Sequence, residues 1–355
     1  MIRCAVVGAT GIVGQTFLKV LEKKKLKIDE YVLFASSRSK GKEVKFMDED
    51  YIIQELTKDS FKETKFDYAL FSAGGGISKE YAPLAAKTGC IVIDNSSCFR
   101  MHDDVPLVVP EVNPYDIFKH NNIIANPNCS TIQAMLPLKA LEEKYQIKRI
   151  VFSTYQAVSG AGNAGINDLL NTRNGDEPSK FPYNISENCI PHVDTFFENN
   201  YTKEEMKMIE ETRKILHNPN LPITATCVRI PIINSHSESI NIEFYNKFNI
   251  EDIFKTLSEY PGIKVVDDVK NNIYPINEFA NDTDDVLVGR IRRDYSVKNG
   301  INLWVVADNV RKGAASNAVQ ILEKLIEKKA WYLNHCSGKI NVDKKRVSTF
   351  IFYMV

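Results

Sequence analysis

The sequence predicts a two-lobed α/β protein: a Rossmann-type, doubly wound parallel sheet domain, followed by an α+β domain with a mixed or antiparallel sheet. Its 355 residues exceed the usual size of one domain and suit two. Over about the first 130 residues, short β-branched runs alternate with amphipathic segments, which is typical of βαβ units. Beyond about residue 149 the strand-like runs become longer, so a second lobe with a different sheet is expected.

The first lobe, expected over residues 1–128, is predicted from five short apolar runs. They lie at residues 2–7, 31–35, 68–72, 91–94 and 123–125. A helix through residues 17–21 follows the first run, and amphipathic segments separate the others. Strands joined by such crossovers lie parallel, so we expect a parallel sheet with helices on both faces.

The second lobe is expected over residues 129–312. Its strands are expected at residues 150–158, 223–230, 239–245, 286–292 and 302–307. Residues 240–244 alternate apolar and polar side chains with a period of two, which indicates a sheet with one solvated face.

A final helix is expected over residues 313–328, where apolar side chains recur at helical spacing. We expect this helix to complete the first lobe. The stretch 331–355 combines the basic patch Lys344-Lys345-Arg346 with an apolar end and matches no assignable element. It stays unassigned, as either a docked or a disordered tail.

The bulk composition points to small-molecule partners. The 45 basic and 45 acidic residues cancel and form no long run of one sign, so neither nucleic acid nor membrane is expected to bind. Seven cysteines without a C-x-x-C pair indicate reduced thiols, and no metal site is expected. No apolar stretch approaches the roughly 20 residues that span a bilayer, and no signal-peptide layout begins the chain, so we expect a cytoplasmic protein.

A glycine-rich loop directly follows the first expected strand and opens the first helix. Gly8, Gly11 and Gly14 allow a sharp turn and a close approach of the backbone to a pyrophosphate, whose charge meets the N–H groups of a helix N-terminus. The spacing is G-x-x-G-x-x-G, not the commoner G-x-G-x-x-G, so a purely structural glycine turn is the alternative.

The end of the second expected strand indicates which dinucleotide binds. NAD-specific folds place an acidic residue there, whereas this chain has Ser36, Ser37, Arg38 and Ser39. Hydroxyl groups and a guanidinium suit a 2′-phosphate, so NADP is favoured over NAD, with Arg38 as the main contact. A solvated basic turn is the alternative.

Cys129 is the expected nucleophile. It lies between an expected strand and an expected helix, and a helix N-terminus is expected to lower its thiol pKa and to stabilise an oxyanion nearby. A cysteine after a nucleotide lobe suggests a thioester or thiohemiacetal that exchanges hydride with nicotinamide. Of six histidines, His236 is the best acid/base partner because Ser235, Ser237 and Glu238 form a polar cluster around it at a strand end. A surface or capping histidine is the alternative.

Five motifs lie in order across residues 1 to about 328: Gly8 to Gly14, Asp94 to Ser97, Asn126 to Thr131, Tyr155 to Gly160 and Asp308 to Ala315. Together they resemble the bacterial type of aspartate-β-semialdehyde dehydrogenase. The resemblance implies that NADPH reduces β-aspartyl phosphate to aspartate β-semialdehyde and phosphate, a step toward lysine, threonine and methionine. It also implies that residues 129–312 form the catalytic and dimerisation domain, and that the protein is a homodimer or homotetramer.

The resemblance further implies a role for each matching residue. Cys129 matches the nucleophile, His236 the acid/base residue, and Gln156 the glutamine that orients the acyl group. Substrate contacts are implied for Arg229 with the carboxylate, Glu204 with the amino group, Arg100 and Lys207 with the phosphate, and Asn95 beside them. Contacts with NADP are implied for Gly8, Thr10, Gly11, Ile12, Val13, Gly14, Ser37, Arg38, Ser39, Ser159, Gly160 and Asn317.

Two features depart from the family pattern, and two other functions compete with this one. The tail from Trp331 lies beyond the pattern, and Ser235 stands beside His236 where relatives often carry glycine. N-acetyl-glutamyl-phosphate reductase has similar chemistry, but its substrate lacks the free amino group that Glu204 would bind. A nucleotide-binding regulatory protein without activity would not need Cys129, Gln156, Arg229 and His236 together.

Overall fold

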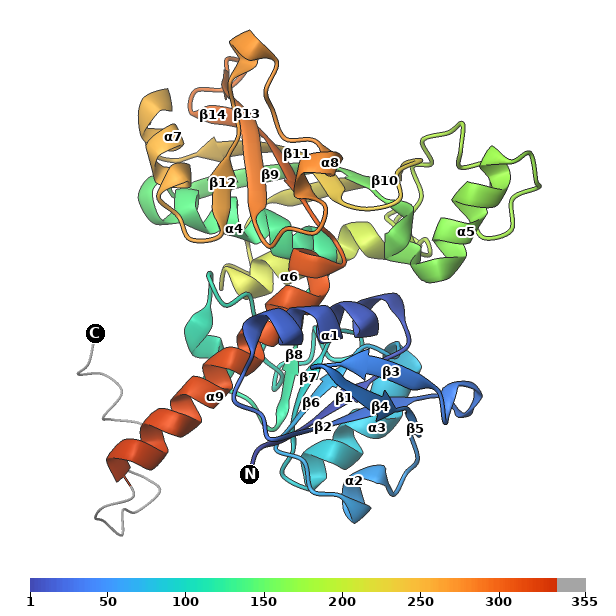
Figure 1. The fold of residues 1–355 in the computed structure, drawn as a ribbon. Coiled ribbons are helices and arrows are strands. Elements are labelled where there is room, and N and C mark those ends of the chain that lie inside the picture. The colour runs from blue at the N-terminus through green and yellow to red at the C-terminus, as the bar shows by residue number, and fades with distance from the viewer. Residues whose placement is uncertain (337–355) are drawn as a thin grey trace.

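The computed structural model describes residues 1–336 and shows two lobes, each built on one six-stranded sheet (Figure 1). In the first lobe all strand pairs are parallel, in the order β5-β2-β1-β6-β7-β8. Numbered along the chain, this order is 3-2-1-4-5-6, that of a doubly wound dinucleotide-binding sheet. The Rossmann-type lobe predicted from the sequence is thereby confirmed. Its strands are β1 (Arg3–Val7), β2 (Glu30–Ala35), β5 (Gln54–Glu55), β6 (Tyr68–Phe71), β7 (Ile91–Asp94) and β8 (Ile123–Ala125).

Helices cover both faces of this sheet. They include α1 (Ile12–Lys24), α2 (Ser60–Glu63), α3 (Gly75–Lys87) and α9 (Asn317–Cys336), and a small hairpin of β3 (Glu43–Phe46) and β4 (Glu49–Ile52) lies beside them. Phe17 and Leu21 of α1 share a buried core with Val6 of β1 and with Ile321 and Leu322 of α9. The C-terminal helix therefore completes the first lobe, as the sequence predicts.

The second lobe has a mixed sheet in the order β10-β9-β11-β14-β13-β12, as predicted. Its two outer pairs are parallel and its three inner pairs are antiparallel. Helices α4 (Cys129–Tyr145), α6 (Lys203–Ile215) and α7 (Ile250–Ser258) pack on it, and α5 (Gly162–Arg173) extends to one side (Figure 1). The strands are β9 (Ile147–Gln156), β10 (Ile223–Arg229), β11 (His236–Phe244), β12 (Ile263–Val265), β13 (Val286–Asp294) and β14 (Gly300–Ala307).

The last helix differs from its predicted bounds at both ends. A π-helical turn over Arg311–Ser316 precedes α9, and α9 continues to Cys336, so residues 331–336 are helical and not part of an unassigned tail. The remainder of the expected tail, 337–355, lies outside the described residues. The expected domain boundary at residues 128 and 129 stays a prediction.

The helices within residues 1–336 include none with the length and apolar character needed to cross a membrane.

Candidate active site

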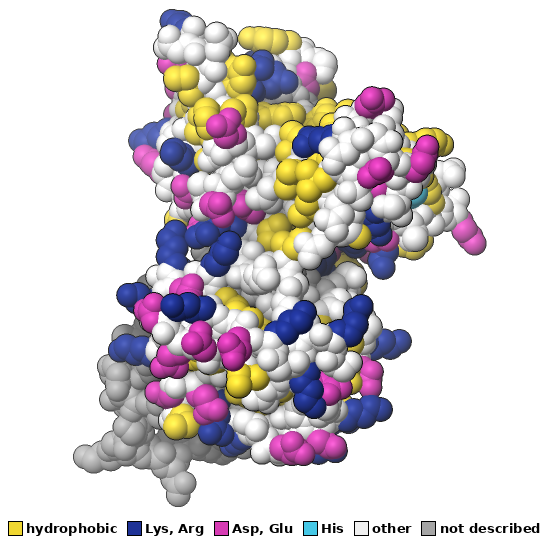
Figure 2. Space-filling view, turned by 45° about the vertical axis from the view of Figure 1, so that its right-hand side comes forward, with side chains coloured by type: hydrophobic (Ala, Val, Ile, Leu, Met, Phe, Trp, Pro, Cys, Tyr) yellow, Lys and Arg dark blue, Asp and Glu magenta, His cyan; other side chains and the backbone are white. Residues whose placement is uncertain are grey.

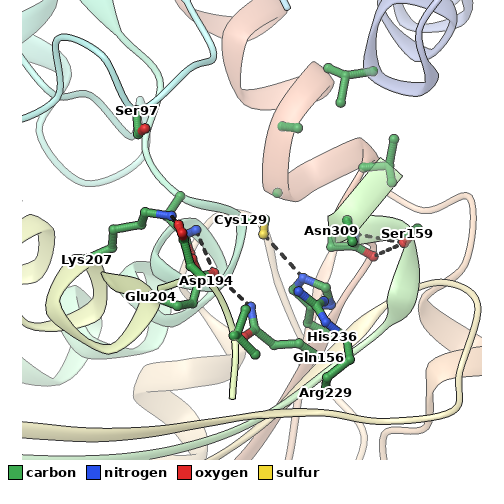
Figure 3. Close-up of a pocket in the computed structure, with 18 of the residues that line it drawn as sticks. Ser97, Cys129, Gln156, Ser159, Asp194, Glu204, Lys207, Arg229, His236 and Asn309 are labelled. Atoms are coloured by element: carbon green, nitrogen blue, oxygen red, sulfur yellow. Dashed lines mark hydrogen bonds and ion pairs between the residues drawn. The ribbon is translucent and has the colours of Figure 1, made fainter. Parts of the chain in front are cut away.

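A cavity of about 580 Å³ lies where the two lobes meet, and it collects side chains from widely separated parts of the chain. The start of α4, the end of β9, the start of β11 and one face of α6 all contribute to it (Figure 3). It is lined by the catalytic and substrate-binding residues predicted from the sequence: Asn95, Arg100, Cys129, Gln156, Glu204, Lys207, Arg229 and His236. The structure thus brings all eight together.

Cys129 is the first residue of α4, so the expected position at a helix N-terminus is correct. The preceding Asn128 caps this helix, because its Oδ1 accepts the N–H groups of Ser130 at 3.0 Å and Thr131 at 3.4 Å. These two N–H groups therefore serve the cap, which limits the expected oxyanion site at the start of α4. The dipole of the helix still favours negative charge at Cys129.

His236 lies directly beside the nucleophile. Its Nε2 is 3.2 Å from Sγ of Cys129, and its Nδ1 accepts the backbone N–H of Ala157 at 3.0 Å (Figure 3). Because Nδ1 accepts a hydrogen bond, the neutral ring carries its proton on Nε2, where it points toward the sulfur. The pair is therefore arranged for His236 to donate to an anionic sulfur.

The pKa of the Cys129 thiol contradicts the expectation from helix position alone. Burial, followed by the negative charge of Glu204, raises this pKa to about 12, although Arg100, Arg229 and the Ser130 N–H act in the opposite direction. Burial also lowers the pKa of His236 to about 3, with a further contribution from Arg229. Both members of the pair are consequently neutral in the protein alone, because desolvation outweighs the helix dipole.

Arg229 and Gln156 end two neighbouring parallel strands, in register with one another. Nη1 of Arg229 donates to the carbonyl of Ala157 at 2.6 Å, whereas its buried Nε has no protein partner within the described residues. Nε2 of Gln156 donates to Ser130 Oγ and to Glu204, whereas its buried Oε1 likewise has no partner there. Each side chain thus keeps one polar group available for a bound molecule.

One face of α6 carries a buried acid and its cation. Glu204 accepts hydrogen bonds from Asn128, Gln156 and Lys207, the last at 2.8 Å. Burial opposes ionisation of Glu204, but Lys207 and the two amides together lower its pKa to about 2. Lys207 also pairs with Asp194 at 2.9 Å, so its ammonium lies between two carboxylates (Figure 3).

Arg100 is fixed by three partners. Nε donates to the carbonyl of Asn126, Nη2 to the carbonyl of Asn95, and Nη1 to Glu211. A guanidinium has five N–H groups, so two remain for a ligand in the cavity that Arg100 lines. Asn95 thereby acts through its backbone on Arg100, and its side chain accepts a hydrogen bond from Asn126.

Known proteins resemble both lobes. Residues 3–120 match the semialdehyde dehydrogenase NAD binding domain, and residues 138–312 match the semialdehyde dehydrogenase dimerisation domain. The aspartate-semialdehyde dehydrogenase of Aquifex aeolicus is 53% identical over 335 residues, which cover 92% of this chain and 98% of that protein. The chain belongs to the aspartate-semialdehyde dehydrogenase family.

Solved structures of this family have the same fold. Aspartate semialdehyde dehydrogenase II of Vibrio cholerae, solved in complex with ASA, matches with a TM-score of 0.88 and 46% identity. That match covers 92% of this chain and 98% of the other. The Candida albicans enzyme, solved with NADP, matches with a TM-score of 0.73 and 27% identity over 93% and 99% of the two chains.

The glycine loop makes a tight turn that leaves the start of α1 uncapped. Gly8 has a φ of +86°, and a Cβ on Gly14 would lie 2.0 Å from the Gly8 carbonyl oxygen, so both positions demand glycine. Gly11 caps α1 without any side-chain hydrogen bond, and no acidic residue lies in the first turn. The N–H groups of that turn therefore suit a phosphate.

The expected nucleotide contacts form two groups. Val13, Ser159 and Gly160 line the main cavity, and Ile12 and Ser159 line a smaller neighbouring hollow. The remaining members of the loop and of the segment Ser37, Arg38 and Ser39 lie outside the main cavity, where α1 begins and β2 ends.

Asn317 lies deeper than expected. It is fully buried and does not line either hollow, and its amide nitrogen donates to Val108 and Asn126. Its Oδ1 has no partner among the described residues, so the carbonyl is the only part of this side chain still suited to a ligand. A direct contact with NADP stays a prediction for Asn317.

The hydrogen bonds of Ser235 explain why a residue other than glycine can stand next to His236. Its φ of 67° is left-handed, a conformation in which a non-glycine residue costs roughly 1–2 kcal/mol. Three hydrogen bonds hold it there: its N–H donates to Asn309, its Oγ bonds Asn281, and its carbonyl accepts from Asn277. These bonds offset the strain, so the loop presents His236 without a glycine.

Some residues of the site were not predicted from the sequence. Asp194 reaches Lys207 from the loop before α6, with a left-handed φ of 69°, and residues 180–182 form a wall of the cavity. Neither belongs to a motif, so the sequence carries no signal that marks Asp194 as part of the site. Long loops that fold back over a site leave no periodic signal in a sequence.

Proposed function

We propose that the chain reduces β-aspartyl phosphate to aspartate β-semialdehyde and phosphate, with NADPH as the reductant and a thioester on Cys129 as the intermediate. The observation that carries this proposal is the 3.2 Å pair of Cys129 and His236, within a cavity that Glu204, Arg100, Lys207 and Arg229 also line. Family membership supports the same activity.

The charges of the cavity complement this substrate. The guanidinium of Arg229 suits the α-carboxylate, because Nε and Nη groups can grip two oxygens. Glu204 is ionised and suits the α-ammonium, which an N-acetylated substrate lacks. Arg100 and Lys207, each already oriented by carboxylates, suit the phosphate.

In the first step, the thiol proton of Cys129 passes to the phosphate group that departs, the sulfur attacks the acyl carbon, the S–C bond forms and the C–O bond to phosphate breaks. Nε2 of His236 and the dipole of α4 stabilise the negative charge on sulfur and on the acyl oxygen. Arg100 and Lys207 hold the leaving phosphate, and Gln156 orients the acyl group.

A bound nicotinamide supplies the hydride that reduces the thioester. His236 then supports the expulsion of the Cys129 thiolate by donating to the sulfur, and the aldehyde carbonyl forms as the C–S bond breaks. Bound substrate and cofactor fill the cavity and displace water, which protects the thioester from hydrolysis.

The residues that follow β2 favour NADP over NAD as the cofactor. Arg38 is exposed there, between Ser37 and Ser39, and it forms none of the ion pairs found within residues 1–336. A guanidinium without a carboxylate partner suits the 2′-phosphate. A cytoplasmic location stays a prediction.

We also propose a homodimer formed by the second lobe. One face of its sheet packs on α4 and α7, whereas the opposite face presents Tyr155, Trp304, Arg290 and Arg292 around a shallow hollow. Figure 2 shows apolar side chains gathered on this lobe, while charged ones dominate the first lobe. The match to a dimerisation domain supports a second copy as the partner. A tetramer has no separate support.

The activity is tested in the direction of aspartate β-semialdehyde oxidation. Phosphate-dependent reduction of NADP with this aldehyde, and far slower reduction with N-acetyl-glutamate semialdehyde, is the expected result. The reverse preference would assign the chain to N-acetyl-glutamyl-phosphate reduction. Reduction of NADP that does not depend on phosphate would contradict the acyl phosphate chemistry.

A further inference from the structure

Glu211 is the deepest acidic residue on the site-facing side of α6. Glu204, Lys207 and Glu211 recur at spacings of three and four, which places them on one face of the helix. Unlike the first two, Glu211 does not line the cavity, and only 1% of its side chain is exposed. The sequence and the proposed mechanism leave it without a role.

The carboxylate of Glu211 joins two parts of the site. Oε1 accepts Nη1 of Arg100 at 3.0 Å, and Oε2 accepts the backbone N–H of Asn128 at 2.7 Å. Arg100 is the proposed phosphate arginine, and Asn128 immediately precedes Cys129. One buried side chain therefore fixes the phosphate-binding group and the backbone that leads into the nucleophile.

Asn128 is held by α6 at two points. Its side-chain Nδ2 donates to Glu204 at 2.9 Å, while its backbone N–H donates to Glu211. The same residue caps α4 through its Oδ1. A carboxylate can accept from both Arg100 and Asn128, whereas a glutamine in its place has one acceptor oxygen and presents an N–H₂ group to the other donor.

We propose that Glu211 is a positioning residue for the phosphate half of the reaction. It orients the two remaining N–H groups of Arg100 toward the phosphate and holds that arginine at a fixed position relative to Cys129. The inference rests on the proposed function, because it requires phosphate to bind at Arg100. Glu211 does not contact the substrate itself.

The test is Glu211→Gln, measured in the direction that consumes phosphate. Loss of one charge-assisted hydrogen bond is expected to raise the KM for phosphate by about 10- to 100-fold. The KM values for the aldehyde and for NADP should change by less than about twofold, because Arg229, Glu204 and the glycine loop are untouched. An equal rise in all three KM values, or no change in that for phosphate, would overturn the proposal.

Glu210→Gln is the matched control. It removes the same charge from the neighbouring position of α6, where Glu210 forms no ion pair within the described residues, and it should leave the KM for phosphate unchanged. Glu211→Asp keeps the charge on a shorter side chain and should give an intermediate KM for phosphate. This variant also serves if Glu211→Gln fails to fold.

A double-mutant cycle with Arg100→Lys tests whether Glu211 acts through Arg100. If it does, Glu211→Gln should add less than about threefold to the phosphate KM of the Arg100→Lys protein. Full additivity of the two effects would contradict the proposal. A wild-type protein without phosphate-dependent activity would instead refute the proposed function, so the two failures are distinguishable.

Discussion

Helices α1 and α4 both begin at the cleft, but their N-termini are built in opposite ways. The first turn of α1 follows Gly11 and has no side-chain cap. The first turn of α4 follows Asn128, whose side chain caps it and which is itself held by two buried carboxylates. An uncapped terminus suits a phosphate that arrives and leaves, whereas a capped one holds a covalent nucleophile in place.

The largest effect on activity is expected from a change at the N-terminus of α4. Cys129→Ser should abolish dehydrogenase turnover, because a hydroxyl does not form an accessible anion beside His236. NADP binding at α1 should stay nearly unchanged, which titration calorimetry can measure. Substantial residual turnover would remove Cys129 from the mechanism.

A change at His236 should affect the chemical step. In His236→Asn the side chain retains some hydrogen bonding but loses the titrating ring, so kcat should fall about 10²- to 10⁴-fold with little change in KM. The limb of the pH–rate profile that reports this histidine should move or vanish. Arg229→Leu is the contrast, since loss of a carboxylate partner should raise the aldehyde KM markedly. Wild-type kcat and an unaltered profile in His236→Asn would make that residue structural.

At the α1 terminus the expected effect is smaller and concerns the cofactor. Arg38→Glu should weaken the binding of NADPH by about 10- to 100-fold, because it replaces a charge-assisted partner of the 2′-phosphate with a repelling carboxylate. The binding of NADH should be weakened far less, since NADH has no 2′-phosphate. Affinities for the two cofactors that fall in parallel would refute the role of Arg38.

The smallest effect is expected on stability, and again on the α4 side. Glu238, two residues after His236, is completely buried, neither carboxyl oxygen has a partner within residues 1–336, and burial raises its pKa well above the usual value. A raised pKa in the folded state makes its contribution to stability decrease as pH rises above about 4.3, the value in the unfolded chain.

Replacing Glu238 by Met should therefore stabilise the protein at pH 7 by about 1–3 kcal/mol. The gain should shrink as pH falls toward 4.3, because the wild-type carboxyl is then protonated in both states. Urea unfolding of both proteins from pH 5 to pH 8 measures the difference. A difference that is constant with pH would show that Glu238 does not titrate on unfolding.

The N-termini of α1 and α4 also show which features of the site could be predicted from the sequence. The glycine spacing, the strand before it and the lack of an acidic residue after β2 are local features, so the α1 site and its sheet could be predicted. The motif around Cys129 and the partner His236 could be predicted as well. Asp194 and Glu211 could not, because their roles depend on contacts with residues 13 and 111 positions away in the chain.

The thiol pKa is the clearest error of local reasoning. A helix N-terminus can be read from sequence, but the burial that raises the pKa of Cys129 arises from α6, β11 and the interlobe contact. The last helix also differs from its prediction, because it continues to Cys336 and does not end at the expected residue 328.

The covalent intermediate on Cys129 is tested most directly by intact-protein and peptide mass spectrometry. The protein is mixed with aspartate β-semialdehyde and NADP in the absence of phosphate, so that oxidation proceeds but phosphorolysis does not. We predict an aspartyl adduct that maps to Cys129, is absent in Cys129→Ser and disappears when phosphate is added. An adduct on another residue, or NADP reduction and phosphate-dependent turnover without any adduct, would contradict the thioester mechanism.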